Sequence, residues 1–364
     1  MDLRWLTERC CCVTSTAAMC LGLLPVRGWL TAPRPWPAPA AYGLGITLLA
    51  LLEPPNFKTS PAYIRDLDPS SPLFPFLVDC FLAFVRTTVV FSLCSNRAAL
   101  TNLQRCLLHY QHVHPLTPRG YRAVLYLHLF VAIFLADVYA LFDTGRGGRK
   151  PWGVIQVAGM VTGVQWGMSF CMALLPKVRL GALAGDLRDE CARLIAGAGD
   201  RPSSSTSSLC EQWRSLRLRQ QYLHDMSYAT TRVYQWLLAA ILLTSTLYAN
   251  LQIADCLLKI TGAKKDIIPP EGQLLRKLAQ ISNFIMHSLC IVVLFVVYRS
   301  EGNENEQMCH MLQGHHAVLS SHATQEEPGC VREVTLFINQ IRFQEPTDII
   351  FGLLDLNLSS MMRV

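Results

Sequence analysis

Continuous apolar stretches separated by polar connections dominate the pattern of this chain. Six stretches are each about as long as the roughly 20 residues that a helix needs to cross a hydrocarbon core. Their apolar residues follow one another without the alternation of a transmembrane β-strand, which excludes a barrel. The pattern therefore predicts an all-α integral membrane protein, a multi-pass helix bundle whose six complete spans cover residues 36–52, 73–94, 124–142, 154–175, 233–258 and 278–298.

Prolines and polar residues are expected to end these spans. Glu53-Pro54-Pro55 closes the first span, which is only just long enough, and Pro176 is expected to stop the fourth. The Gly/Ser-rich stretch near 195–210 indicates a flexible linker. From Glu211 to Trp236 the spacing is helical again, so the fifth span is predicted to continue well beyond the membrane.

The predicted spans divide the chain into four parts. Residues 1–35 form an N-terminal segment, and residues 36–298 form the six-span bundle with its linker. Residues 299–348 form a polar segment that contains a helix at Val331–Arg342. Residues 349–364 form the start of a seventh helix.

The orientation in the membrane is less clear from charge. The longer connections, 95–123, 176–232 and 299–348, lie on the same side as the N-terminus. The density of Lys and Arg favours the opposite side as cytoplasmic, whereas the 95–123 connection, which has four arginines and no acidic residue, favours a cytoplasmic N-terminus. Charge alone leaves the orientation open.

Composition agrees with a membrane protein. The chain is 51% hydrophobic and only 16% charged, whereas soluble domains carry roughly 25% charged residues. Its net charge of +6 is small for 364 residues, and no basic run with interleaved aromatics indicates a nucleic-acid partner. The sequence contains no C-x-x-C pair, G-x-x-x-x-G-K-[ST], G-x-S-x-G or H-E-x-x-H. We therefore expect neither an enzyme nor a cofactor.

The last part of the chain carries a recognisable order of elements. A helical stretch contains Phe337 and Gln340, a polar connection follows, and an apolar segment then begins at residue 352. That segment fits the pattern G-Φ-Φ-x-Φ-[D/N], in which Φ is apolar, at Gly352, Leu353, Leu354, Leu356 and Asn357. With the length, the span count and the long loop before the fifth span, the chain resembles the insect gustatory receptor family.

The resemblance implies a function and a topology. It implies a tetrameric, ligand-gated, non-selective cation channel in the plasma membrane of taste neurons, sited in their dendrites. The N-terminus would be cytoplasmic, the outer halves of the helices would bind a small-molecule tastant, and partner subunits would be the same chain or other gustatory receptors.

One departure from the family concerns the seventh helix. The family signature T-Y-x-x-x-x-x-Q-F, which belongs to the pore-lining helix, does not occur in this sequence. The chain therefore resembles a receptor that stops before its pore helix, and a non-conducting or modulatory form is an alternative. A G-protein-coupled chemoreceptor is a second alternative, which would place the N-terminus outside. A secondary transporter should show an internal repeat, and none is found.

Polar residues inside the spans are the candidates for function, because such residues are costly in a membrane. Asp79 and Arg86 lie on one helical face about 10 Å apart along the axis, which indicates a structural pair. An apolar pocket with a few polar groups and an aromatic platform suits a sugar or an alkaloid. The candidates for such a pocket, or for interhelical hydrogen bonds instead, are Asp137, Tyr139, Gln165, Trp166, Asn283 and His287.

A set of cysteines and histidines near the C-terminus has the composition of a metal site. Its spacings match no standard zinc pattern, and glutamates surround it. A solvated cytoplasmic segment without metal is therefore the favoured interpretation of Cys309, His310, His315, His316, His322 and Cys330.

Overall fold

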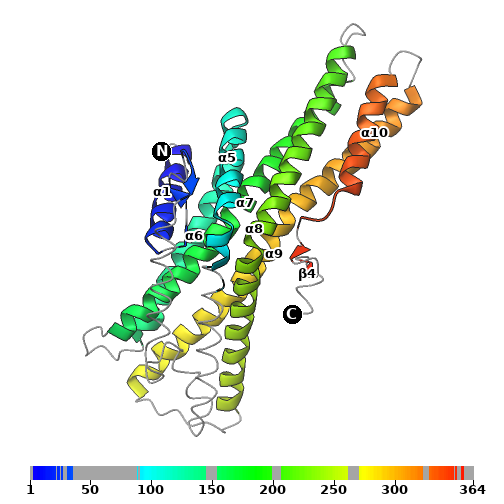
Figure 1. The fold of residues 1–364 in the computed structure, drawn as a ribbon. Coiled ribbons are helices and arrows are strands. Elements are labelled where there is room, and N and C mark those ends of the chain that lie inside the picture. Colours follow the sequence, from blue (N-terminus) through cyan, green and yellow to red (C-terminus); the bar gives the residue numbers. More distant parts are fainter. Residues whose placement is uncertain are drawn as a thin grey trace.

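Long helices form an elongated bundle in the computed structural model (Figure 1). It describes residues 3–21, 23–24, 26–27, 31–35, 88, 91–144, 154–198, 206–260, 270–322, 328–347, 349–350 and 354–355. The helices are α1 (Leu3–Cys20), α5 (Arg97–Val113), α6 (Pro118–Thr144), α7 (Val154–Ala198), α8 (Thr206–Ile260), α9 (Pro270–His322) and α10 (Pro328–Phe343). Two antiparallel strand pairs complete it, β1 (Val26–Arg27) with β2 (Arg34–Pro35) and β3 (Ile349–Ile350) with β4 (Leu354–Asp355).

The bundle is that of a multi-pass membrane protein. Among the described residues, three helical stretches are long and apolar enough to cross a membrane, namely Pro118–Ala140, Gly163–Gly197 and Ile281–Ser320. They overlap the third, fourth and sixth predicted spans, and the fifth falls within the continuous helix α8. The first and second predicted spans, with Asp79 and Arg86, lie outside the described residues, so the count of six stays a prediction.

Helix α7 occupies the centre of the bundle. Its spanning window is 78% buried, against 28% for α6 and 39% for α9. It contacts α6, α8, α9 and also α1, and Figure 1 shows the neighbouring helices arranged around it. Because α7 has neighbours on all sides, its apolar residues need not keep to one face.

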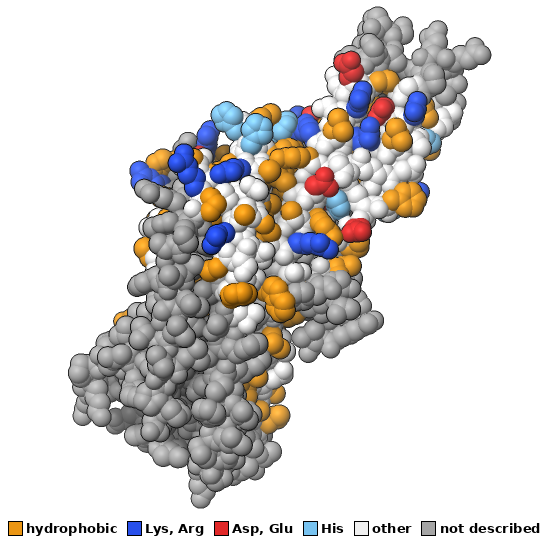
Figure 2. All heavy atoms as spheres, viewed as in Figure 1, with side chains coloured by type: hydrophobic (Ala, Val, Ile, Leu, Met, Phe, Trp, Pro, Cys, Tyr) orange, Lys and Arg blue, Asp and Glu red, His pale blue; other side chains and the backbone are white. Residues whose placement is uncertain are grey.

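The outer helices expose apolar stripes where a membrane would contact them. On α9, Leu278, Ile281 and Ile285 are 48–55% exposed and recur at helical spacing. On α6, Tyr126 and Ile133 form a similar stripe. Figure 2 shows Lys, Arg and His side chains gathered on the upper part of one face, and hydrophobic ones along its lower described edge. Exposed apolar surface of this extent indicates a lipid-facing belt.

Pro176 does not end the fourth span, contrary to the prediction from sequence. It lies inside α7, which continues to Ala198. A proline inside a helix removes one hydrogen bond and costs about 3 kcal/mol. Here Phe170, Leu174 and Leu180 are at most 1% exposed, and burying such side chains contributes about 1.5–3 kcal/mol each. Packing of the central helix therefore outweighs the local cost.

Much of the sequence predicted to connect the spans is helical in the structure. Helix α5 fills most of 95–123, and α9 continues without a break to His322, deep into the segment 299–348. Helices α7 and α8 take in both ends of the linker predicted near 195–210, whose middle, 199–205, lies outside the described residues. Helix α8 has 55 residues, so at 1.5 Å per residue it is roughly 80 Å long. The helices therefore continue well beyond the apolar stretches predicted from sequence.

The described residues after Pro346 are not helical, contrary to the predicted start of a seventh helix. Ile349 pairs with Asp355 and Ile350 with Leu354 in an antiparallel ladder. Both isoleucines are β-branched, which favours an extended backbone over a helix. The other residues of 349–364 lie outside the described part.

Gly163 permits the close approach of α6 and α7. A Cβ atom at this position would lie 2.5 Å from Cγ1 of Val138, which is itself buried. We expect Gly163→Ala to lower the free energy of unfolding by about 1–3 kcal/mol, the usual cost of overpacking. Thermal unfolding in detergent measures this loss of stability. Gly314→Ala is the control, because nothing lies within 4 Å of a Cβ there, and an equal loss in both variants would contradict the packing argument.

Candidate functional site

Five aromatic rings from four helices meet in the middle of the bundle. Trp166 of α7 stacks on Phe134 of α6 and on Phe170, with ring centroids 4.9 and 5.7 Å apart. His287 of α9 stacks on Tyr248 of α8 at 4.9 Å and meets Trp166 edge-on at 5.4 Å. These separations are those of favourable aromatic pairs. We call these five residues the aromatic cluster.

Three polar atoms at the aromatic cluster are buried without a partner among the described residues. They are Nε1 of Trp166, Nδ1 of His287 and Oδ2 of Asp137. The Asp137 carboxyl also interacts with the side chains of Ser282 and Asn283. A buried polar group without a hydrogen bond costs about 1–3 kcal/mol. These three atoms are therefore the places at the aromatic cluster where a ligand could supply a missing hydrogen bond.

The structure brings together four of the six candidates from sequence. Asp137, Asn283 and His287 are buried, and Trp166 is half-buried, on facing helices. Gln165 instead donates from Nε2 to the carbonyl oxygen of Leu21, at 3.2 Å.

Tyr139 points away from the aromatic cluster and is 53% exposed. Sequence reasoning missed Phe134 and Tyr248. Phe134 precedes Asp137 by three residues, which places both on one helical face, so spacing was a usable signal for it. Tyr248 offered no such signal, because its proximity to His287 depends on how α8 packs against α9.

The glutamine of the C-terminal family pattern fastens α10 to α8. Gln340 Nε2 donates to the carbonyl oxygen of Arg217 at 3.1 Å and to Oε1 of Gln220 at 2.7 Å. Phe337, one turn earlier, is fully buried. Of the other pattern residues, Leu354 lies in β4, while Gly352, Leu353, Leu356 and Asn357 lie outside the described part.

A second buried polar group holds the segment that follows α10. Lys177 of α7 and Glu301 of α9 have side chains 0% and 2% exposed, with Nζ and Oε2 4.0 Å apart. Lys177 Nζ also donates to Ser227 Oγ of α8 at 2.5 Å and to the carbonyl oxygen of Thr347 at 3.2 Å. Ser227 donates in turn to Glu301.

Both the hydroxyl and the carbonyl oxygen of Thr347 are hydrogen-bonded. Its hydroxyl donates to Oε2 of Glu301 at 2.9 Å, and its carbonyl oxygen accepts from Thr231 as well as from Lys177. We call Lys177, Ser227, Thr231, Glu301 and Thr347 the latch network. It ties the segment after α10 to three helices at once, and any movement of that segment must break buried, charge-assisted hydrogen bonds.

His224 makes the latch network sensitive to acid. Its Nδ1 lies 3.9 Å from Oε1 of Glu301. Burial lowers the pKa of the His224 imidazole below its ordinary value of 6.5, outweighing the opposite influence of Glu301 and Asp225, and Lys177 lowers it further. The folded protein therefore prefers neutral His224, and the unfolded chain takes up the proton first.

The pH dependence of stability follows from that preference. The stability that depends on His224 is full above about pH 6.5 and is lost as the pH falls from there to the folded pKa, by about 1.4 kcal/mol for each unit of lowering. We expect His224→Gln to lose less stability on acidification than the unmodified chain, because the variant lacks this titrating group. The melting temperature between pH 5 and 8 measures the difference. His112→Gln, at an exposed histidine, is the control. An unchanged acid loss in His224→Gln would contradict the assignment.

The cysteine and histidine set near the C-terminus is partly packed rather than solvated. Cys309 and Cys330 are buried, His315 lies 5.6 Å from the ring of Trp213, and His316 Nε2 is 3.0 Å from the hydroxyl of Thr335. Within the described residues, no three ligating side chains converge on a metal position.

Comparison with known proteins gives one match. A family model described as "7tm Chemosensory receptor" matches residues 14–364. The match includes the whole aromatic cluster, the whole latch network and every described helix after α1. A search of curated proteins finds no significant sequence match.

Proposed function

Because this chain belongs to the 7tm chemosensory receptor family, we propose that it is a gustatory receptor subunit, which binds a small-molecule tastant and gates a non-selective cation current. The family makes the chain a membrane chemoreceptor. The finer assignment to taste and to a channel is ours, and it depends on the C-terminal pattern around Gln340.

The aromatic cluster supports the tastant-binding part of this proposal. A sugar ring or a planar alkaloid could stack on Trp166, while its polar groups bond to the Trp166 N–H, to His287 and to the carboxyl of Asp137. These atoms have no partner of their own among the described residues. Four different helices supply the cluster and Asp137. A bound tastant would therefore favour one arrangement of the helices over another, which is what gating requires.

The orientation proposed for the receptor has its N-terminus in the cytoplasm, in the plasma membrane of taste neuron dendrites. Arg4 of α1, Arg34 of β2 and Arg105 of α5 line one cavity, and a cytoplasmic position for them is the arrangement that the positive-inside rule favours. We further propose that subunits assemble as homo- or heterotetramers with other gustatory receptors.

The test is a recording from cells that express the full chain, alone and with other gustatory receptors. We expect a tastant from a panel of sugars and alkaloids to evoke a current that persists when G-protein signalling is blocked. A tag at the N-terminus should be accessible only after permeabilisation. A response that needs G proteins, or a tag that is reached from outside, would instead indicate a G-protein-coupled receptor.

A further inference from the structure

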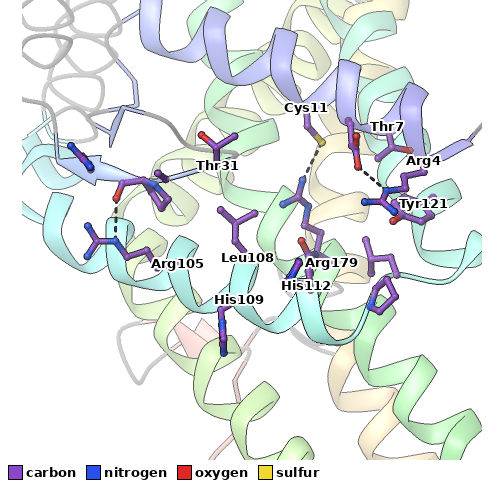
Figure 3. Close-up of a pocket in the computed structure, with 17 residues that line it drawn as sticks. Arg4, Thr7, Cys11, Thr31, Arg105, Leu108, His109, His112, Tyr121 and Arg179 are labelled. Carbon is purple, nitrogen blue, oxygen red and sulfur yellow. Dashed lines mark hydrogen bonds and ion pairs between the residues drawn. The ribbon is translucent and has the colours of Figure 1, made fainter.

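A large basic cavity lies beside α1, apart from the aromatic cluster. Its volume is about 930 Å³, and its walls come from α1, the β1–β2 hairpin, α5, the start of α6 and α7. Figure 3 shows Arg179 rising from α7 toward Cys11 of α1, and Arg105 of α5 reaching the backbone at Pro33. A cavity of this size is ample for an organic ligand.

The lining is strongly positive. Four arginines and one glutamate line the cavity, so its net charge is +3 even with the two histidines neutral. The glutamate, Glu8, is already bound to Arg4, with Oε1 2.9 Å from Nε. Among the described residues, no carboxylate pairs with Arg34, Arg105 or Arg179.

Arg179 is the informative member of this set. It is only 7% exposed. Its Nη2 donates to Cys11 Sγ at 3.1 Å, and its Nε is buried without a partner among the described residues. Burial raises the pKa of the Cys11 thiol, but a hydrogen bond from His128 and the charge of Arg179 outweigh it, so the pKa is lowered. One sulfur occupies only part of the guanidinium fork, which has five donors.

The cavity lies where the lipid-facing surface begins. Tyr121 lines it, and Tyr126, 66% exposed, opens the apolar stripe of α6. Five residues of helix separate them, a rise of roughly 7–8 Å. A ligand in the cavity is therefore within reach of the polar surface of a membrane.

We propose that this cavity binds an anion with several phosphate groups, held by Arg179, Arg105 and Arg34. Guanidinium groups match phosphate oxygens in paired hydrogen bonds, and the excess of positive charge calls for more than one negative charge. Such groups are offered by the headgroup of an inositol phospholipid or by a soluble inositol polyphosphate. Bound there, the anion would fasten α1 to α5 and α7.

The experiment measures binding to the purified full chain in detergent micelles by thermophoresis. The probes are inositol hexakisphosphate and a short-chain phosphatidylinositol 4,5-bisphosphate, with short-chain phosphatidylcholine as the uncharged control. Binding of both phosphorylated probes supports the shared chemistry, and binding of one alone identifies the source. Binding of neither, or of phosphatidylcholine equally well, overturns the proposal.

Variants locate the site. We expect Arg179→Gln to weaken binding about tenfold or more, as loss of a charge-assisted pair does. Because Arg179 is buried, the double variant Arg34→Gln/Arg105→Gln, at two exposed positions, gives the same test without a risk to folding. Arg193→Gln, on the exposed part of α7 outside the cavity, is the matched control. Equal affinity in the double variant and this control would refute the site. The measurement needs neither tastant nor current, so its failure leaves the receptor function untouched.

Discussion

Glu301→Ala is expected to lower the free energy of unfolding by about 3–5 kcal/mol, because it leaves Lys177 buried without its counter-ion. Lys177 would keep its bonds to Ser227 and Thr347, but both acceptors are neutral. Loss of the carboxylate beside a fully buried ammonium is therefore expected to be costly. Thermal unfolding in detergent at pH 7.5 measures the loss.

Two further variants separate the charge from the packing. Glu301→Gln keeps the shape of the side chain and can still accept from Thr347, so its loss should come mainly from the missing charge. The double variant Lys177→Met/Glu301→Leu removes both charges, and replacing a buried pair by apolar residues is often neutral or stabilising. We therefore expect it to recover most of the stability. A double variant as unstable as Glu301→Ala would show that hydrogen bonds, rather than charge, dominate.

The same variants report on the segment after α10. Thr347 is held by Glu301 and Lys177 together. In Glu301→Ala, amide hydrogen exchange around Thr347 should therefore accelerate relative to the unmodified chain, and by more than exchange in α10 does. Arg188→Gln is a control at another contact with α9, because Arg188 bonds to Glu304 at 2.5 Å on a more exposed surface. If both variants accelerate exchange at Thr347 equally, the latch network is not a local restraint.

The sequence predicts the helices well and their ends poorly. Apolar runs identified α6, α7 and α9, because residues that face lipid or the core of a helix bundle are nearly always apolar. Pro176 was expected to end its helix on local grounds, and the structure shows it inside α7. The energy that overrides it comes from tertiary packing of Phe170, Leu174 and their neighbours, which no local rule contains.

For the polar clusters, too, the sequence predicts the residues involved better than their contacts. That Asp137, Trp166 and His287 carry function could be inferred from their residue types within apolar runs. Gln165 and Trp166 are consecutive and therefore about 100° apart around a helix, and only the packing of α7 decides which of them meets the aromatic cluster. The pairing of Lys177 with Glu301 joins residues that local spacing cannot connect.

Trp166 is expected to dominate the response to tastant. It makes stacked or edge contacts with Phe134, Phe170 and His287, and tryptophans at binding sites are typical hot spots, whose truncation costs about 2 kcal/mol or more in binding. If a tastant binds at the aromatic cluster, Trp166→Ala should raise the concentration for a half-maximal current about 30-fold or abolish it. Trp236→Ala, at a tryptophan of α8 that is 47% exposed, should leave that concentration unchanged.

Truncating a half-buried tryptophan that packs on the core also destabilises the fold, by up to about 3–5 kcal/mol, so a second variant must separate binding from folding. Trp166→Phe keeps a stacking face and removes only the N–H, whose nitrogen has no partner among the described residues. We expect normal surface expression and a rise in the half-maximal concentration of about three- to tenfold, the loss of one hydrogen bond. His287→Phe removes the imidazole, whose Nδ1 also has no partner among the described residues, and should act on the same tastants. If both conservative variants reach the surface and respond as the unmodified chain does, the tastant binds elsewhere, and the aromatic cluster is packing between helices.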